Sequence, residues 1–180
     1  MSGVCVREVA TEDDLAAVEA LVGEYSTWVR DVLLRDFGIT VDYGAGTAAL
    51  FTELATVLKP PGHLYLAMLN GTGVGTVGLK HIDYSVAELK RMYVLPHARG
   101  HGVGRRLLER LLLDAKAAGY AVVRLETMSW MTDALALYRR FGFRERQTYG
   151  AREFEDIRAV DDIAVFMELT LPAAIPVVGV

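Results

Sequence analysis

A chain of 180 residues with 52% apolar and 23% charged residues has an ordinary globular composition and is long enough for one sizeable core. Its 23 acidic and 19 basic residues give a net charge of −4, which argues against a nucleic-acid partner, because such surfaces carry a basic excess. The single cysteine, Cys5, has no partner for an internal disulfide, so we expect a reducing compartment.

Neither a membrane segment nor a secretion signal is expected in this sequence. No apolar run approaches the ~18 residues that cross a bilayer, and the first residues lack the basic-then-apolar order of a signal peptide. We therefore expect a cytoplasmic protein without a membrane partner. Residues 1–172 are expected to form one domain, and the apolar, proline-broken residues 173–180 a tail that frays or packs on a partner, such as a second copy in a homodimer.

The first third of the chain predicts a strand followed by helices. Residues 4–9 have the composition of a short strand, and Thr11 precedes an acidic cluster in the pattern of a capping box. Apolar residues then recur at helical spacing until a break at 38–46. A second helix is predicted at 47–58, and Pro60-Pro61 ends it.

From residue 63 onward the pattern becomes that of strands alternating with helices. Asn70-Gly71 lies between apolar runs, which is a strong hairpin signal. The predicted elements are strands at 63–69, 73–80 and 87–94, a helix at 103–118, a strand at 122–126, a helix at 132–141, and a final strand pair at 143–148 and 163–170 around a loop at 149–162. We expect one α+β domain with a mostly antiparallel sheet and a helix that crosses between the fourth and fifth strands.

A glycine-rich turn, Arg99-Gly-His-Gly-Val-Gly104, joins the third of these strands to the long helix. Glycine permits positive φ and close approach of the backbone to a ligand, and a helix start offers free N–H groups and a positive dipole end. The turn therefore predicts a phosphate site, although a glycine-rich turn by itself also fits a simple tight connection. It lacks the glycine spacing of a dinucleotide fold and the Gly-Lys-Ser/Thr ending of a P-loop, which argues against a nucleotide enzyme of that kind.

The charge distribution around the turn favours an anion. No acidic residue occurs between Glu88 and Glu109, and Arg105 and Arg106 occupy the first helical turn, where the helix dipole disfavours cations. A bound anion would reverse that penalty. The alternative is that both arginines simply pair with Glu109 one turn along the helix.

Two motifs in register resemble the Gcn5-related N-acetyltransferase (GNAT) family. Arg99-x-x-Gly102-x-Gly104, preceded by Val94-x-Pro96, resembles the first signature of that family, Arg/Gln-x-x-Gly-x-Gly/Ala. About thirty residues later, Ala134-x-x-Leu137-Tyr138-x-x-x-Gly142-Phe143 resembles the second. The resemblance covers most of residues 4–170 and is most specific over 86–143.

The resemblance implies a GNAT-type sheet splayed between its fourth and fifth strands, with acetyl-CoA in the gap. The fourth strand would hold the pantetheine arm, and the amides of the glycine turn would bind the pyrophosphate. An asparagine of the family that contacts the pantetheine is replaced by Met131, for which Thr132 is a possible substitute. The implied cofactor-binding residues are Met92, Tyr93, Val94, Arg99, Gly100, His101, Gly102, Val103, Gly104, Arg105, Thr132 and Tyr138.

The family transfers its acyl group directly to an amine, and three groups here match the roles that this needs. Glu88 is the candidate general base, and strand alternation predicts that it shares a face with Met92 and Val94. The alternative for Glu88 is an ion pair with Lys90 or Arg91. Tyr138 is the candidate general acid, or else a helix aromatic packed beside Ala134. The amide of Met92 is the candidate oxyanion donor.

The remaining candidates are weaker. His97 and His101 have the spacing of a metal pair but flank a turn and lack a third ligand, so a metal site is not expected. Tyr25, Trp28 and Tyr43 fall in the segment that forms the acceptor wall in the family, although helix-spaced aromatics more often belong to a core. The expected function is an N-acetyltransferase that acts on a primary amine of a small molecule or peptide; the alternative is a non-catalytic acyl-CoA-binding or sensing module on the same fold.

Overall fold

The structure is a computed structural model, and it describes residues 3–41, 54, 57, 60–149 and 157–172. Seven strands form one sheet in the order β1-β2-β3-β4-β5-β7-β6. The strands are β1 Val4–Glu8, β2 His63–Leu69, β3 Thr72–His81, β4 Val86–Val94, β5 Val122–Met128, β6 Arg144–Arg146 and β7 Ala164–Thr170. The helices are α1 Glu12–Phe37, the 3-10 helix η1 Pro96–Ala98, α3 Val103–Ala117, α4 Thr132–Arg140 and α5 Arg158–Asp161.

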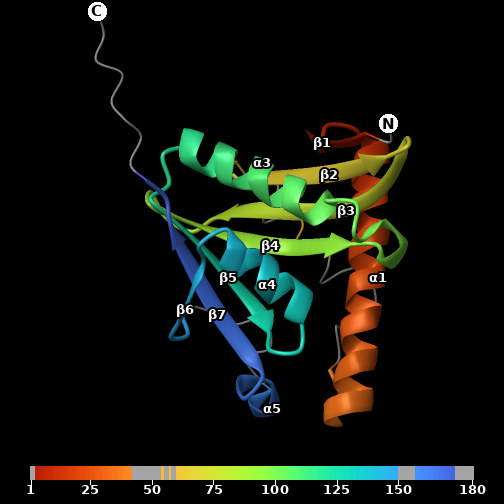
Figure 1. Cartoon of the computed structure of the whole chain (residues 1–180), viewed down its shortest axis with the longest axis vertical. Coiled ribbons are helices and arrows are strands. Elements are labelled where there is room, and N and C mark those ends of the chain that lie inside the picture. The colour runs from red at the N-terminus through yellow and green to blue at the C-terminus, as the bar shows by residue number, and fades with distance from the viewer. Residues whose placement is uncertain (1–2, 42–53, 55–56, 58–59, 150–156, 173–180) are drawn as a thin grey trace, which may run out of the picture.

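The sheet opens between β4 and β5, which form its one parallel pair among the described residues. Their pairing runs from Val86 opposite Val122 to Leu89 opposite Leu125 and then stops. Beyond that point the two strands diverge, as Figure 1 shows where β5 and β7 turn away from β4. A parallel connection needs a crossover, and α3 supplies it. The predicted α+β fold, mostly antiparallel and splayed between the fourth and fifth strands, is confirmed.

Local sequence signals explain several element boundaries. The Oγ1 atom of Thr11 accepts a hydrogen bond from the backbone N–H of Asp14 at 3.1 Å, which is the predicted cap of α1. Asn70 and Gly71 have φ values of 53° and 83°, as a two-residue hairpin turn between β2 and β3 requires. The expected turn and cap are both confirmed.

Apolar side chains on the two faces of the sheet form separate clusters. One face packs against α3 and α4 through residues such as Leu107, Leu111 and Leu135. The opposite face packs against α1 through Val18 and Val22. In Figure 1, α3 and α4 cover one side of the sheet, and α1 runs past the end of β4. The divergence of β4 and β5 thus lies between two helical layers.

The structure differs from the sequence prediction mainly near the C-terminus. The predicted loop at 149–162 contains a short helix, α5, and the strand predicted at 143–148 is only the three residues of β6. Of the helix predicted at 47–58, only Leu54 and Val57 are described, and both are helical and buried. The predicted tail at 173–180 lies outside the described residues. Within the described ranges, no helix combines the length and hydropathy that a membrane crossing needs.

Replacing Asp14 with asparagine is expected to lower the melting temperature at pH 7. The carboxylate is 2% exposed, accepts from the N–H of Ala10 at 3.2 Å and pairs with Arg7. The hydrogen bond from Ala10, aided by Arg7 and Thr11 and opposed by burial, lowers the pKa of Asp14 below its usual 3.8. Because the lowered pKa belongs to the folded state, the stabilisation is present above the unfolded pKa and lost as pH falls through the folded one.

The difference in melting temperature between the parent and Asp14→Asn should therefore become smaller below about pH 4. Asp13→Asn, an exposed neighbour in the same helical turn, is the control and should cost less at pH 7. A difference that is the same at pH 3 and pH 7 would contradict this account of Asp14.

Candidate active site

A bulge in β4 determines which side chains of this strand enter the opening of the sheet. Gly78 of β3 pairs with Lys90, but Thr76 pairs with Tyr93, so β4 contains one extra residue. Arg91 in this stretch has a φ of 53°, which is uncommon for a residue other than glycine. The extra residue inverts the alternation of side chains in the second half of the strand.

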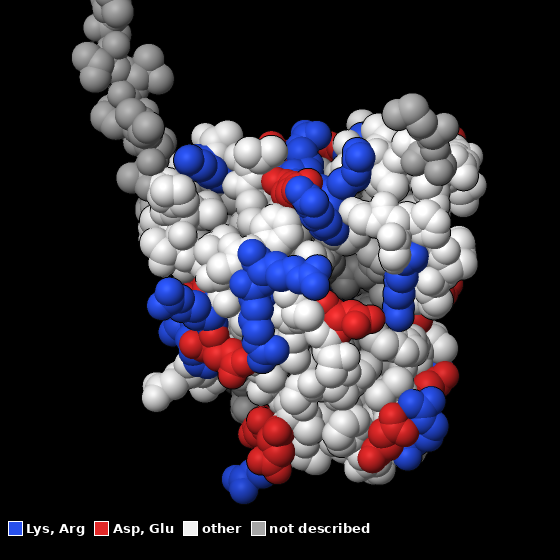
Figure 2. Space-filling view, in the orientation of Figure 1, with Lys and Arg blue, Asp and Glu red and all other residues white. Residues whose placement is uncertain are grey.

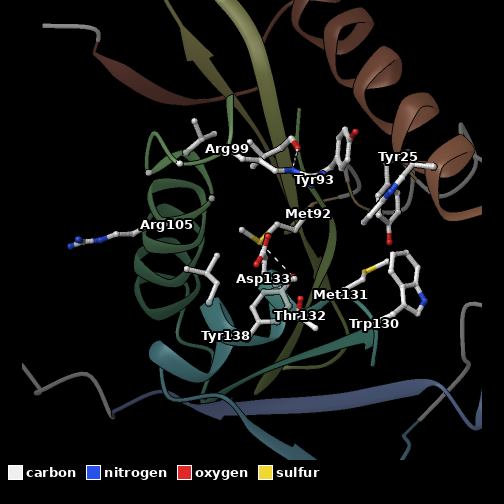
Figure 3. Close-up of a pocket in the computed structure, with 18 residues that line it drawn as sticks. Tyr25, Met92, Tyr93, Arg99, Arg105, Trp130, Met131, Thr132, Asp133 and Tyr138 are labelled. Atoms are coloured by element: carbon white, nitrogen blue, oxygen red, sulfur yellow. Dashed lines mark hydrogen bonds between the residues drawn. The ribbon is translucent and has the colours of Figure 1, made fainter. Parts of the chain in front are cut away.

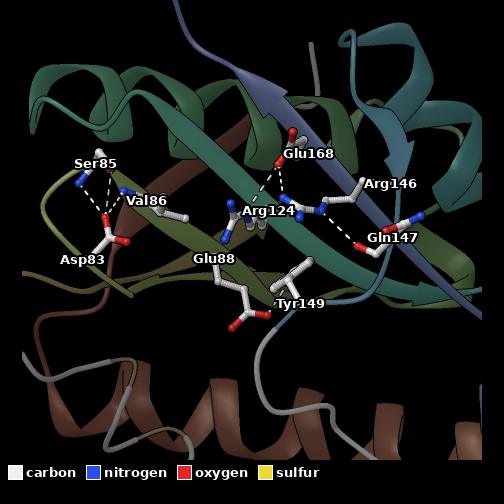
Figure 4. Close-up of polar contacts among 9 residues, drawn as sticks. All are labelled: Asp83, Ser85, Val86, Glu88, Arg124, Arg146, Gln147, Tyr149 and Glu168. Atoms are coloured by element: carbon white, nitrogen blue, oxygen red, sulfur yellow. Dashed lines mark hydrogen bonds and ion pairs between the residues drawn. The ribbon is translucent and has the colours of Figure 1, made fainter.

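The prediction that Glu88 shares a face with Met92 and Val94 is therefore wrong. Met92 and Val94 pack with the α3 and α4 cluster, as Leu89 does before the bulge. Glu88 lies on the other side, the side of α1 (Figure 4). Simple alternation fails because the bulge adds a residue between Glu88 and Met92.

A cavity of about 440 Å³ occupies the opening between β4 and the start of α4. Figure 2 shows a hollow on this face, with basic side chains beside and above it and an acidic side chain along its lower edge. All of the predicted cofactor-binding residues line the cavity except His101, and Glu88 does not line it. The lining consists of Tyr25, Trp28, Met92, Tyr93, Val94, Arg99, Gly100, Gly102, Val103, Gly104, Arg105, Trp130, Met131, Thr132, Asp133, Ala134, Leu137 and Tyr138.

The glycine turn presents the start of α3 to this cavity. Gly102 caps the helix with a φ of 76°, a conformation that strains residues with a side chain, and it provides no side-chain acceptor. The first turn of α3 contains no acidic residue, and its first intrahelical acceptor, the carbonyl of Gly102, is used by Arg106. The amides of Val103 to Arg105 precede that bond, so the helix offers them to an external anion.

Gly104 keeps the wall of the cavity free of a side chain. A Cβ atom at this position would lie 3.4 Å from Cδ2 of Leu137 on α4 and 3.5 Å from Cε of Met92 on β4. The backbone of α3 is therefore exposed where α3, α4 and β4 converge.

The arginines near the turn have different partners. Arg105 donates from Nε to Oε1 of Glu109 at 2.7 Å, so the pairing considered for it is confirmed. Arg106 instead donates to the carbonyl of Val4 at 3.0 Å. Arg99 donates from Nε to the carbonyl of Val94 at 3.1 Å. In Figure 3 the side chain of Arg105 extends away from the cavity, whereas Arg99 lies beside Tyr93.

Tyr138 lies at the base of the cavity with its hydroxyl directed at β4 (Figure 3). It is 4% exposed, and the hydroxyl donates to Sδ of Met92 at 3.6 Å. Its ring also contacts Phe143, with 5.8 Å between centroids. Burial raises the pKa of Tyr138, so the hydroxyl keeps its proton at neutral pH and is available as a donor.

Glu88 belongs to a buried polar network on the α1 side of the sheet (Figure 4). It is 5% exposed, accepts from the hydroxyl of Tyr149 at 3.3 Å, and lies 3.7 Å from Nζ of Lys90. The ion pair considered for Glu88 is thus present with Lys90. Burial and the adjacent Glu88 carboxylate raise the pKa of Tyr149, which therefore remains a hydrogen-bond donor.

Two arginines fix Tyr149 in that network. Arg124 and Arg146 lie 5.1 Å and 5.2 Å from the centroid of the Tyr149 ring. Both also bind Glu168, Arg124 through Nε at 3.4 Å. No sequence pattern marks Tyr149, because it lies in a stretch without periodicity and contacts Glu88 only in the folded chain.

The other candidates take less central positions. His97 and His101 are exposed, and Nδ1 of His101 lies 3.0 Å from the carbonyl of Arg99. Thr132 lines the cavity beside Met131, while Tyr43 lies outside the described residues. The part of the chain that the structure describes contains no group of three His, Cys, Asp or Glu side chains arranged for a metal. Trp130 and Asp133 also line the cavity, although no motif in the sequence marks either of them as a site residue.

Several proteins with similar sequences are named as acetyltransferases. The profile of the Acetyltransferase (GNAT) family matches residues 29–143. The IAA acetyltransferase of Azospirillum brasilense is 40% identical over 121 residues, which are 66% of this chain and 74% of that protein. The aminoalkylphosphonate N-acetyltransferase of Salmonella typhimurium is 31% identical over 147 residues, 79% of this chain and 86% of the relative.

Solved structures agree on the fold. An acetyltransferase from Streptococcus agalactiae superposes with a TM-score of 0.71 at 20% identity, covering 95% of this chain and all of that one, 100%. A GNAT family acetyltransferase from Elizabethkingia anophelis, solved with acetyl-CoA bound, gives a TM-score of 0.61 at 19% identity and covers 93% and 98% of the two chains. With its splayed sheet, its glycine turn and a family profile that spans most of its length, this chain is an enzyme of the Acetyltransferase (GNAT) family.

Proposed function

We propose that this enzyme transfers an acetyl group from acetyl-CoA directly to a primary amine of a small molecule or peptide, without an acyl-enzyme. The observation that carries the proposal is the cavity between β4 and α4, bounded on one side by the start of α3 and at its base by Tyr138. These features lie together only because β4 and β5 part after Leu89 and Leu125.

Acetyl-CoA would be held mainly by backbone groups. The amides of Gly100 to Arg105 suit the pyrophosphate, whereas the amide of Arg99 already donates to the carbonyl of Pro96 at 3.3 Å. The second half of β4 at Met92, Tyr93 and Val94, which lies beyond the last pair with β5, suits the pantetheine arm, with Thr132 beside it. When bound, acetyl-CoA supplies the activated thioester. Gly104 supports this assignment, because it lines the cavity without a side chain at the start of α3.

Two groups near Met92 would assist the transfer. The amide of Met92 would donate a hydrogen bond to the carbonyl oxygen as negative charge develops there. The protonated hydroxyl of Tyr138, 3.6 Å from Sδ of Met92, would give its proton to the departing sulfur. Burial of Tyr138 raises its pKa, so the hydroxyl is protonated before the reaction, although the same shift makes it a weaker acid.

Glu88 would act as the general base from the α1 side of the sheet. Its burial and its hydrogen bond from Tyr149 hold the carboxylate in one position, but it does not line the cavity. It would therefore take the proton of the amine through a water molecule.

Glu88→Gln, which keeps the size of the side chain, is expected to lower kcat/KM for the amine by roughly 100-fold or more. Release of free thiol from acetyl-CoA in the presence of amine measures this, and calorimetry checks that acetyl-CoA still binds. Glu145→Gln, an exposed carboxylate on β6, is the control. Full activity in Glu88→Gln would remove Glu88 from the role of base.

The experiment that tests the proposed function compares thiol release with and without an amine panel. Release that requires an amine supports an N-acetyltransferase. Binding of acetyl-CoA with no amine-dependent release would indicate the acyl-CoA-binding module instead. A cytoplasmic location is part of the proposal, because the exposed Cys5 is a free thiol, as is usual in a reducing compartment.

A further inference from the structure

The side of the cavity that faces α1 is lined by four aromatic rings. Tyr25 and Trp28 of α1 lie 5.6 Å and 6.2 Å from Tyr93 of β4, measured between centroids. Trp130, from the β5 to α4 connection, meets Trp28 edge-on at 5.0 Å. Figure 3 shows Tyr25, Met131 and Trp130 on the far side of β4 from α3. The bulge produces this division, because it turns Tyr93 toward α1 and Met92 toward α3.

Arg99 brings a positive charge to this aromatic surface. Its Cζ atom lies 5.5 Å from the centroid of Trp28 and 6.0 Å from that of Tyr93. A guanidinium that stacks on rings uses its face for the contact and keeps its N–H groups in the plane for hydrogen bonds. Nε uses one donor on the carbonyl of Val94, which fixes the stem of the side chain. The two terminal amino groups carry four further donors, more than the nearby hydroxyl of Tyr93 can accept.

The charge of Arg99 is not neutralised by a direct carboxylate partner. Arg30, Arg35 and Arg105 each pair with an acid at 3.0 Å or less. Among the residues that the structure describes, Arg99 has no such pair, and Glu24 of α1 instead accepts from the hydroxyl of Tyr93 at 2.9 Å.

The cavity has two other charged lining residues. The side chain of Arg105 points away from the cavity, and Asp133 lies in the first turn of α4 and not on the α1 wall. Burial and the bond to Glu24 raise the pKa of Tyr93 to about 12, partly offset by Arg99, so Tyr93 stays neutral beside the guanidinium. Arg99 is thus the cation that the α1 wall presents to the cavity.

We propose that this wall is the acceptor site and that it selects an amine carrying an aromatic ring and an anionic group. The ring would pack against Trp28 and Trp130, and the anion would accept from the terminal amino groups of Arg99. The inference rests on the proposed function, since it names the substrate class of that reaction. It assigns the side chain of Arg99 to the acceptor, while the backbone amide of Arg99 donates to the carbonyl of Pro96 at 3.3 Å.

The acceptor class can be tested by binding alone, with 3-phenylpropionate as the probe and the neutral, isosteric 3-phenylpropionamide as its match. Ligand-observed saturation-transfer NMR gives both dissociation constants for the full chain with CoA present. We expect the carboxylate to bind about 10-fold more tightly than the amide, as a charge-assisted hydrogen bond allows. Both tryptophans of the chain line this cavity, so tryptophan emission should change over the same concentration range.

Arg99→Gln should remove the preference for the carboxylate and lower its affinity about 10-fold. Arg30→Gln removes the same charge from a paired, exposed position on α1 and should keep the preference. Equal binding of carboxylate and amide by the parent, or an unchanged preference in Arg99→Gln, overturns the inference.

The same samples separate this inference from the proposed function. Calorimetric titration with acetyl-CoA, made on parent and Arg99→Gln, reports on the donor site. Parent protein that binds acetyl-CoA but shows no carboxylate preference refutes the acceptor class and leaves the acetyltransferase proposal intact. A loss of acetyl-CoA affinity in Arg99→Gln with the carboxylate preference retained would assign the guanidinium to the donor instead.

Discussion

Gly104→Val is expected to weaken acetyl-CoA binding by roughly 10- to 100-fold, the effect of inserting an isopropyl group into a close-packed gap. A Cβ atom at this position would lie in ordinary van der Waals contact with Leu137 at 3.4 Å and Met92 at 3.5 Å, so the two further methyl groups of valine have little room. A valine side chain would therefore occupy the gap between α3, α4 and β4. Calorimetric titration with acetyl-CoA measures the loss.

The control for this variant is Gly23→Val on α1, where an added Cβ meets nothing within 4 Å. Gly104→Ala places only the Cβ and should give an intermediate affinity. Circular dichroism and the melting temperature establish that each variant folds. A folded Gly104→Val that binds acetyl-CoA as tightly as the parent would show that the cofactor lies elsewhere.

Tyr138→Phe is expected to lower kcat by about 100- to 1,000-fold, the range of general acid catalysis, with acetyl-CoA affinity within a few-fold of the parent. The variant keeps the ring packed against Phe143 and removes only the hydroxyl that points at Met92. Since burial raises the pKa of Tyr138, its deprotonation should cause no fall in the activity of the parent up to about pH 10. Steady-state kinetics across this range check both statements.

Tyr120→Phe provides the matched control for Tyr138→Phe. Tyr120 is also buried, at 6% exposed, but its hydroxyl lies 2.8 Å from Nδ1 of His81, away from the cavity. It should leave kcat unchanged. An equal fall in both variants would mean that lost packing, and not proton donation, explains the effect at Tyr138.

The sequence predicted those parts of the site that depend on local backbone geometry. The glycine turn, the cap at Thr11 and the hairpin at Asn70-Gly71 each follow from the conformational limits of a few consecutive residues. The two linked motifs also placed Gly104 and Tyr138 on the correct helices, because the order and spacing of the motifs in this sequence match those of the family.

Contacts made by the folded sheet were beyond the reach of sequence patterns. The bulge at Arg91 requires a positive φ at a residue that gives no sign of it, and it reversed the predicted facing of Glu88 relative to Met92. The hydrogen bond from Tyr149 to Glu88 joins residues 61 positions apart. The contact between Arg99 and Trp28 likewise joins the glycine turn to α1. The two segments are far apart in the sequence, so no local pattern predicts that they meet.

The central claim, direct transfer of an acetyl group from acetyl-CoA to an amine, is tested most directly by following an isotopically labelled acetyl group by mass spectrometry. Parent protein, labelled acetyl-CoA and an amine panel should yield a labelled N-acetylated amine and one equivalent of free thiol, with no label on the protein. Label retained on the protein chain, or thiol released at the same rate without any amine, would contradict it.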